Sequence, residues 1–531
     1  MTSPEEHQAT ESSTGSLDAK VALGKTPSSL SQPQYVTLEK YTDAHAADHA
    51  LDHDVAAIAH ELQAEALQPT PTELRSVLRK IDLLMMPMMC CVYTLTFLDK
   101  TTTNYAHLLG FQNDLQFSGA DYSWLGSIFY FGYLFATPVH GILFQKLPLG
   151  RYLAACIILW GTVLALHAAA FNYAGLVVCR LFLGIFEAAV TPGFIMITGR
   201  FYRRNEQVSR TAIWFSCNGW AQILGGLVAY GVLMQPSGSL PVWREMFIIL
   251  GGVTILLGIV VLAFFPSSPE TFKLLSHREK LIAVERIREN QTGLHNKKFK
   301  WYQLREAFLD PRLYLLFFCI LTLDVANGGT SNFGSAIISS LGYNKKITAL
   351  LGMATGLSEV VAVIIMVLIA RWTKTRSIPG IACLLVAILG ASMMVGLPAS
   401  QANAKVAGYA MVMFFAMPTL LLYATLSSSV GGETKKVTFN AVFSLGYAAG
   451  NIIGPQTYRA SEAPNYPSAK AAMLACLCVG GVFYVALFIY HSIENKRRDR
   501  LYPIESAKEQ NATQELSDLT DWERKSFRYP L

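Results

Sequence analysis

Charged residues are scarce in this chain. Asp, Glu, Lys and Arg make up only 15% of its 531 residues, whereas hydrophobic residues make up 52%. A soluble domain averages about 25% charged residues, because its surface must face water. This deficit, together with a mean hydropathy of +0.34, excludes an ordinary soluble domain and indicates that much of the surface faces lipid.

Motifs for nucleotide chemistry and catalysis are also absent. The sequence contains no G-x-x-x-x-G-K-[ST] loop and no nucleophile–base pattern at a recognisable spacing. The apolar stretches contain no cluster of metal ligands. We therefore expect neither an enzyme nor an ATP-driven pump, and we expect no cofactor and no bound metal in the spans.

Cysteine offers no disulfide framework. The nine cysteines lie within apolar stretches, and none belongs to a C-x-x-C pair. We interpret them as small buried hydrophobic residues.

What the chain does have is a series of apolar stretches between Arg79 and His491, each near the ~20 residues that cross a bilayer as a helix. We predict an all-α integral membrane protein with twelve transmembrane helices in two six-helix lobes. The predicted spans are 81–107, 122–144, 150–171, 174–199, 209–234, 244–265, 312–334, 348–370, 377–398, 403–427, 437–457 and 469–491.

The long basic connector after the sixth span divides the chain. The predicted parts are a disordered N-terminal tail, a first lobe, a linker, a second lobe and a C-terminal tail, at 1–78, 79–265, 266–311, 312–491 and 492–531. In the linker, 276–290 has the apolar spacing of an amphipathic helix, which suits a helix at the inner membrane surface that ties the lobes together.

The N-terminal tail carries one pattern, in which His45, His49 and His53 recur every four residues. On a helix these imidazoles would share one face and could hold Zn²⁺. The alternative is a solvated, partly helical tail without metal. Because the first apolar stretch begins only after about 80 residues, we expect no cleavable signal peptide.

Basic residues are distributed unevenly between the connectors. If the N-terminus is cytoplasmic, the inner connectors and the linker carry most of the Lys and Arg residues, and the connector between the first two spans carries none. The positive-inside rule therefore places both termini in the cytoplasm, as an even number of spans requires. We expect the plasma membrane as the location.

Two short basic turns form a weak internal repeat. The connector after the second span reads GILFQKLPLGR at 141–151, and the connector after the eighth reads ARWTKTR at 370–376. Together with the layout of six spans, linker and six spans, they resemble the signature loops of the major facilitator superfamily. That resemblance implies the two-lobed major facilitator fold.

Longer segments resemble one branch of that superfamily, the fungal allantoate permease branch of the anion:cation symporters. These segments are FLDK at 97–100, YSWLGSIFYFGY at 122–133, RLFLGIFEAAVTPG at 180–193, GETKK at 432–436 and APNY at 463–466. The resemblance identifies the branch but not the substrate, because members of this branch carry allantoate, vitamins, small peptides and other organic acids.

The first candidate site residues are an adjacent acid and base, Asp99 and Lys100. Neighbours on a helix point roughly 100° apart, so we do not expect them to neutralise each other. The resemblance implies that Asp99 binds a proton and that Lys100 contacts substrate. The alternative is a packing ion pair with another helix, which we consider less favoured because buried charge stabilises poorly.

Glu187 is the second proton-coupling candidate, since a carboxylate at membrane depth is costly and therefore functional by default. The resemblance also implies proton coupling at this position. The alternative is a glutamate fixed by Arg180, two helical turns earlier. Arg180 could itself bind a substrate carboxylate through its planar fork, or it could be a structural charge.

Polar residues in other spans complete the set of substrate-binding candidates. Asn218 and Gln222 are four residues apart and share a helix face, and Tyr133 and Asn440 lie in the second and eleventh spans. Each could orient a substrate by hydrogen bonds, and hydrogen bonding between helices is the alternative for each.

The second lobe departs from the branch pattern, in which Asn is usual at Asp324 and an uncharged polar residue is usual at Glu359. Both acids, with nearby Asn327, are further substrate-binding candidates. Their negative charge argues against a simple anion as the substrate, whereas a zwitterion, a weak base or a second protonation site would fit.

The resemblance implies a proton-coupled symporter of a small organic acid or a vitamin-like, nitrogenous metabolite. Proton-driven efflux of a small metabolite and a non-transporting nutrient sensor are the alternatives. The expected partners are the substrate, protons and the lipid bilayer, with no nucleic acid, and we expect function as a monomer.

Overall fold

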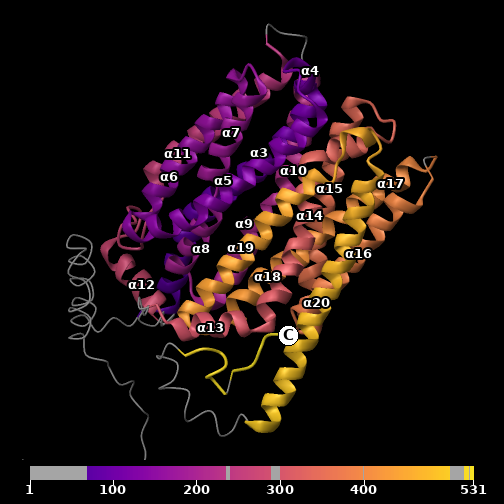
Figure 1. Ribbon diagram of the computed structural model, residues 1–531. Helices are drawn as coiled ribbons and strands as arrows, with labels where there is room; N and C mark the ends of the chain where they lie inside the picture. The colour runs from indigo at the N-terminus through magenta and orange to yellow at the C-terminus, as the bar shows by residue number, and fades with distance from the viewer. Residues whose placement is uncertain (1–68, 235–239, 289–298, 399, 503–518, 526) are drawn as a thin grey trace, which may run out of the picture. The chain divides into compact units, whose positions relative to one another are not determined.

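The computed structural model describes residues 69–234, 240–288, 299–398, 400–502, 519–525 and 527–531, and within these ranges it contains helices but no strand (Figure 1). The histidine stripe at His45, His49 and His53, and most of the predicted N-terminal tail, lie outside the described residues.

Most of the described chain is helical. The helices before the linker are α3 (Pro71–Leu109), α4 (Phe111–Asp114), α5 (Gly119–Lys146), α6 (Leu149–Leu166), α7 (Tyr173–Glu187), α8 (Val190–Phe201), α9 (Arg204–Phe215), α10 (Cys217–Met234) and α11 (Val242–Phe264). The linker contributes α12 (His277–Arg288) and α13 (Trp301–Leu309). The remaining helices are α14 (Pro311–Ser339), α15 (Lys345–Thr373), α16 (Ser377–Gly396), α17 (Ala402–Val412), α18 (Ala416–Ser429), α19 (Glu433–Gln456) and α20 (Pro467–Leu501).

Ten helical segments of the described chain are long and apolar enough to cross a membrane. The other two predicted spans, 209–234 and 437–457, fall on α9–α10 and on α19, which are helical but are not among the ten. An all-helical membrane protein is therefore confirmed, while the count of twelve spans stays a prediction.

Local sequence signals set several helix boundaries. Thr70 caps α3 with a reciprocal bond to Glu73, and Gly110 ends the helix in the left-handed conformation. The predicted fourth span is divided into α7 and α8 after Glu187. In a continuous helix the Ala188 carbonyl would accept a hydrogen bond from the backbone N–H of residue 192, which is Pro192. Because proline has no N–H to offer that carbonyl, the helix is interrupted there, directly after Glu187.

We call the end of the bundle where α3 begins and α20 ends the tail end, and the opposite end the far end. Helices of the first lobe pack mainly on one another, as do those of the second lobe. The lobes meet where α3 packs on α14, α5 on α19 and α10 on α15 (Figure 1). The exact limits of the lobes, 79–265 and 312–491, stay a prediction.

Hydrogen bonds join the two lobes at the far end. The backbone N–H of Ser335 donates to Asn104 Oδ1 at 2.8 Å, and Ser127 Oγ donates to the Ile452 carbonyl at 2.7 Å. The Tyr122 hydroxyl also donates to the Asn332 carbonyl. The Tyr458 ring stacks on that of Phe333, with ring centroids 4.2 Å apart.

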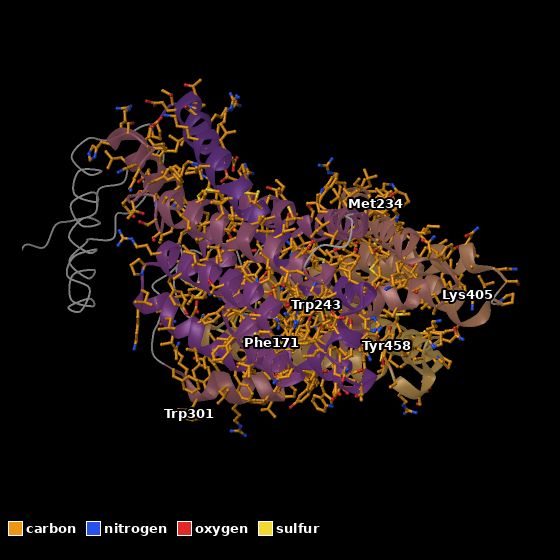
Figure 2. All side chains as sticks on the ribbon, turned by 90° about the horizontal axis from the view of Figure 1, so that it is seen from above. Phe171, Met234, Trp243, Trp301, Lys405 and Tyr458 are labelled. Atoms are coloured by element: carbon orange, nitrogen blue, oxygen red, sulfur yellow. The ribbon has the colours of Figure 1, made fainter. Side chains whose placement is uncertain are left out.

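The linker packs against the tail end. The predicted amphipathic helix is α12, which buries Leu281 and Ile282 and packs on α3 and α8. Arg286 donates to Glu206 at 2.6 Å, which fixes α12 to α9. Helix α13, which was not predicted from the sequence, packs on α14 and α19 and leaves Trp301 exposed at the edge of the view in Figure 2.

The described residues 519–525 and 527–531 form a segment that was not predicted from the sequence, and we call it the C-terminal clasp. It crosses the tail end of the second lobe, where the Leu531 carbonyl accepts a bond from the Arg376 N–H at 2.5 Å (Figure 1). The predicted last span ended at residue 491, but α20 continues to Leu501 and supports the clasp through Asn495, which donates to the Tyr529 carbonyl.

A buried ionic cluster holds the clasp. Asp521 is fully buried and lies 2.5 Å from Arg312 and 2.9 Å from Lys435. Lys435 also lies 2.7 Å from Glu306 and 3.0 Å from Asp310. Burial alone would raise the pKa of Asp521, but the charges of Arg312 and Lys435 hold that pKa below its usual range.

We expect Asp521→Ala to lower the free energy of unfolding by about 3 kcal/mol, because it leaves buried cations without a partner. Thermal unfolding of the purified protein in detergent measures this loss. The matched control is Asp499→Ala, which removes an exposed partner of the clasp residue Arg528 (Asp499 is 56% exposed) and should cost less than about 1 kcal/mol. Equal losses in the two variants would contradict the account.

The same carboxylate predicts a pH dependence. Because its pKa is lower in the folded than in the unfolded protein, its stabilising effect is present above the ordinary carboxyl pKa of about 4 and is lost as the pH falls further. The difference in stability between the wild type and Asp521→Ala should therefore shrink below about pH 4. A difference that grows on acidification would contradict this.

Close packing of α5 on α7 gives a further prediction. A Cβ on Gly184 would lie 2.0 Å from the Phe129 carbonyl oxygen, and only a movement of the helices could relieve that clash. We expect Gly184→Ala to cost at least about 1–3 kcal/mol and to reduce the folded fraction seen by size-exclusion chromatography. Gly141→Ala on α5, where a Cβ meets nothing within 4 Å, should fold normally.

Candidate functional site

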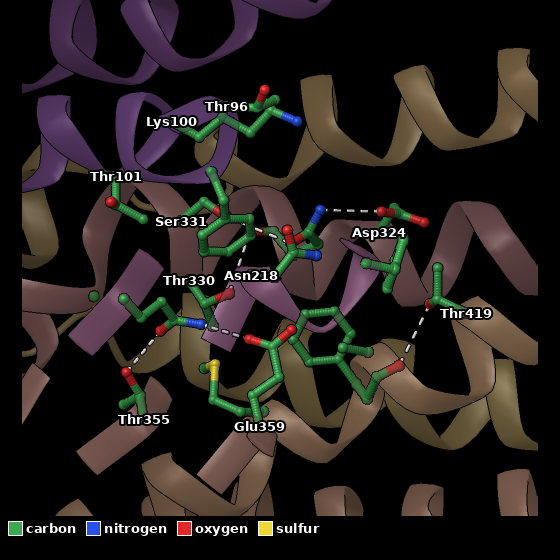
Figure 3. A pocket seen from close by; sticks show the side chains of 18 of the residues that line it. Thr96, Lys100, Thr101, Asn218, Asp324, Thr330, Ser331, Thr355, Glu359 and Thr419 are labelled. Atoms are coloured by element: carbon green, nitrogen blue, oxygen red, sulfur yellow. Dashed lines mark hydrogen bonds between the residues drawn. The ribbon is translucent and has the colours of Figure 1, made fainter. Parts of the chain in front are cut away.

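The candidate site is a cavity between the two lobes, lined by side chains from both (Figure 3). Of the candidates predicted from sequence, seven line it: Lys100, Tyr133, Asn218, Gln222, Asp324, Asn327 and Glu359. The charged residues among the described lining residues are one base, Lys100, and two acids, Asp324 and Glu359. Their surroundings decide what the cavity can bind.

Lys100 and Asp99 point to different neighbours, as the helical geometry of α3 predicts. The Lys100 ammonium lies 3.1 Å from Glu187 Oε1. Asp99 is buried in the first lobe, where Trp160 Nε1 donates to its Oδ2 at 2.6 Å. Because Asp99 does not line the cavity, it cannot touch a solute there in this conformation, and its proton-binding role stays a prediction.

Glu187 stands at the last position of α7, directly before the break that Pro192 causes. Its side chain is 1% exposed, whereas that of Lys100 is 17% exposed. Their contact is ionic, since neither carboxylate oxygen of Glu187 has a hydrogen bond of good geometry. The lysine thus lies between a buried acid and the open cavity, within reach of both.

Glu187 pairs with Lys100, while Arg180 lies in electrostatic range of Glu187 and does not line the cavity. It is buried, one of its terminal nitrogens, Nη2, has no hydrogen-bond partner, and it lies in electrostatic range of Asp99. The geometry favours a structural charge for Arg180 over a substrate ligand.

Asp324 belongs to a polar group on the second lobe. Its Oδ1 accepts bonds from Asn327 Nδ2 at 3.1 Å and from Asn451 Nδ2 at 3.0 Å. Its Oδ2 is buried and has no hydrogen-bond partner. Asn327 also donates to Asn451 Oδ1 at 3.0 Å, so the two amides hold the carboxylate in place.

Glu359 takes part in a hydrogen-bond chain that crosses between the lobes. Gln222 Nε2 on α10 donates to Glu359 Oε2 on α15 at 2.7 Å, and the Thr355 hydroxyl donates to Gln222 Oε1 at 2.7 Å. Asn218 lines the cavity one turn before Gln222, as their shared face predicts. Figure 3 shows Asn218 and Glu359 facing the same space.

Asn440 is the candidate that the structure places away from the site. It is exposed on α19, donates to the Lys436 carbonyl at 2.8 Å and does not line the cavity. The sequence indicated a polar residue in a span, but not which way the helix turns it.

Sequence reasoning also missed several lining residues, among them Thr96, Thr419, Tyr423 and Tyr447. Tyr447 packs against Tyr133 with ring centroids 5.9 Å apart. A signal was present for one missed residue, Ser331, which follows Asp324 and Asn327 at helical spacing on one face of α14. Lone tyrosines and threonines in apolar stretches carry no such signal.

No cluster of three His, Cys, Asp or Glu side chains that could hold a metal ion occurs in the part of the chain that the structure describes. The described lining of the cavity includes amides, hydroxyls, aromatic rings and three charged groups, which suits binding a polar solute.

Comparisons with known proteins agree with this architecture. The sequence profile of the Major Facilitator Superfamily matches residues 89–455. An uncharacterized transporter of Schizosaccharomyces pombe is 36% identical over 503 residues, covering 94% of this chain and 98% of that protein. The allantoate permease of Saccharomyces cerevisiae is 38% identical over 482 residues, covering 88% of this chain and 89% of the permease.

A solved structure shares the fold. A bacterial homologue of the human lysosomal transporter Spinster, in an inward-facing and unoccupied conformation, superposes with a TM-score of 0.57 at 15% identity, covering 79% of this chain and 98% of that one. The profile match and the identity to fungal relatives over most of both chains support one conclusion. The chain belongs to the major facilitator superfamily, as a membrane transporter related to the fungal allantoate permease.

Proposed function

We propose that the chain is a proton-coupled symporter that takes up a small organic acid or nitrogenous metabolite across the plasma membrane, with both termini in the cytoplasm. The observation that carries the proposal is the 3.1 Å contact between Lys100, which lines the cavity, and Glu187, which is buried behind it. The similarity to allantoate permease supports an organic acid as cargo.

The contact suggests how a proton and a solute are coupled. While Glu187 is ionised, it neutralises Lys100, and a carboxylate in the cavity must compete with it for the ammonium group. When Glu187 takes up a proton, its charge disappears, and Lys100 is free to bind a solute carboxylate by a charge-assisted hydrogen bond. Loss of the proton on the inner side restores the Lys100–Glu187 pair and releases the solute. Asp99, held by Trp160, is a second site for a proton.

The two lobes would rock about this midplane site. Bonds such as Ser335 to Asn104 and Ser127 to Ile452 close the far end, which the distribution of basic residues assigns to the outside. This arrangement suits a conformation that releases solute inward, like that of the bacterial neighbour. We propose 79–265 and 312–491 as the moving lobes, 266–311 as their linker, and a monomer as the working unit.

The size of the cavity supports a small cargo. Its free volume is about 150 Å³, comparable with an apolar cavity that accommodates benzene. A solute of a few carbon atoms with polar groups at its ends fits this space, whereas a large substrate requires a wider conformation.

The test is uptake of labelled allantoate, nicotinate, pantothenate, dipeptides and simple carboxylates by cells that express the chain. We expect accumulation that increases at acid outer pH and stops when a protonophore removes the proton gradient. Glu187→Gln should lose accumulation but keep exchange of internal for external solute, because a neutral Glu187 leaves Lys100 available without a proton. Lys100→Met should lose both.

The control is Asp499→Asn, an exposed carboxylate-to-amide change on α20, which should behave as wild type when equal amounts of protein reach the surface. Accumulation by Glu187→Gln that still depends on the proton gradient would show that this acid does not couple transport. Accumulation that a protonophore leaves intact would contradict the symporter itself.

A further inference from the structure

The charges around the cavity are not balanced. The described lining residues include one base, Lys100, and two acids, Asp324 and Glu359. Lys100 is already matched by Glu187 at 3.1 Å. Both acids of the second lobe therefore face the cavity without a base of their own, and a solute with negative charge alone would be repelled by them.

Asp324 has an unused acceptor. Two amides, from Asn327 and Asn451, donate to Oδ1, while the buried Oδ2 has no hydrogen-bond partner. A buried carboxylate oxygen left without a donor costs about 1–3 kcal/mol or more. The amides fix the carboxylate in position but supply no positive charge, so a cationic donor at Oδ2 would both satisfy this acceptor and balance the charge.

Glu359 is in a comparable state. The amide of Gln222 donates to it at 2.7 Å, and the Thr355 hydroxyl fixes that amide from its other side. Both donors, the Gln222 amide and the Thr355 hydroxyl, are neutral groups. Glu359 thus adds negative potential to the same cavity, in which Figure 3 shows both acids.

The rest of the lining also suits a cation. Tyr133, Tyr423 and Tyr447 line the cavity, and the faces of aromatic rings attract positive charge. Lys100 projects from the first lobe and lies within electrostatic range of Asp324. A solute between the lobes would therefore meet a positive group on one side and a negative group on the other.

We infer that the transported solute is a zwitterion, whose carboxylate binds Lys100 and whose protonated nitrogen donates to Asp324 Oδ2. Glu359 assists through its charge. The inference rests on the proposed function, because it uses Lys100 as the carboxylate site. A solute of this kind touches both lobes at once, and its binding thus favours closure of the lobes around it.

The experiment compares matched solutes in the same uptake assay. The pairs are 4-aminobutyrate with pentanoate, in which a methyl group replaces the ammonium, and alanylalanine with propionylalanine, which lacks it. We expect at least one zwitterion to be taken up about tenfold or more faster than its partner, as the loss of a charge-assisted hydrogen bond implies. Asp324→Asn should remove this preference and raise uptake of the pure acid, because it removes a negative charge that repels the carboxylate.

Uptake of the pure acid by Asp324→Asn also reports that the variant folds. If the variant does not reach the surface, Glu359→Gln is tested instead, and we expect it to lose less of the preference. Asp499→Asn is the control. If proton-driven uptake is confined to pure acids, or if the preference survives in Asp324→Asn, the inference is wrong and the symporter proposal stands. If no solute accumulates under a proton gradient, both are wrong.

Discussion

The contact between Lys100 and Glu187 is the interaction on which the account of this molecule depends. Two opposite charges at membrane depth are costly to retain for stability alone, because desolvation offsets most of their attraction. Here one partner is buried in the first lobe and the other faces the cavity. Because of this asymmetry, ionised Glu187 and a solute carboxylate compete for Lys100, and protonation of Glu187 removes that competition.

The fold keeps this pair in place. Pro192 interrupts the helix after Glu187 and sets the acid at the end of α7. The close approach of α5 and α7 at Gly184 fixes α7 one turn earlier. On the opposite wall, the amides of Asn327 and Asn451 hold Asp324. The two lobes thus present fixed charges to each other across a space that a small solute can fill.

Much of this architecture could be predicted from the sequence. Long apolar stretches indicate membrane helices, and ionisable residues inside them are expected to be functional because burying a charge in a membrane costs free energy. Lys100, Asp324 and Glu359 were identifiable for that reason. Arg180 and Asn440 were not separable from them, since the rotation of a helix about its axis depends on packing with other helices.

The C-terminal clasp could not be predicted for a different reason. Charged residues such as Asp521 and Lys435 usually indicate a solvated surface, and nothing local shows that they bury one another. The break between α7 and α8 was signalled by Pro192, but a proline in a span predicts either a kink or an interruption. Only the assembled structure distinguishes these outcomes.

The most direct test of the central claim is the number of protons taken up when solute binds to the purified protein. It can be measured by calorimetry in two buffers of different ionisation enthalpy, with the solute that the transport assay identifies. If solute and Glu187 compete for Lys100, binding near neutral pH draws about one proton into the wild type and none into Glu187→Gln, by the reciprocity of linked binding. Equal proton uptake by both proteins would contradict the account.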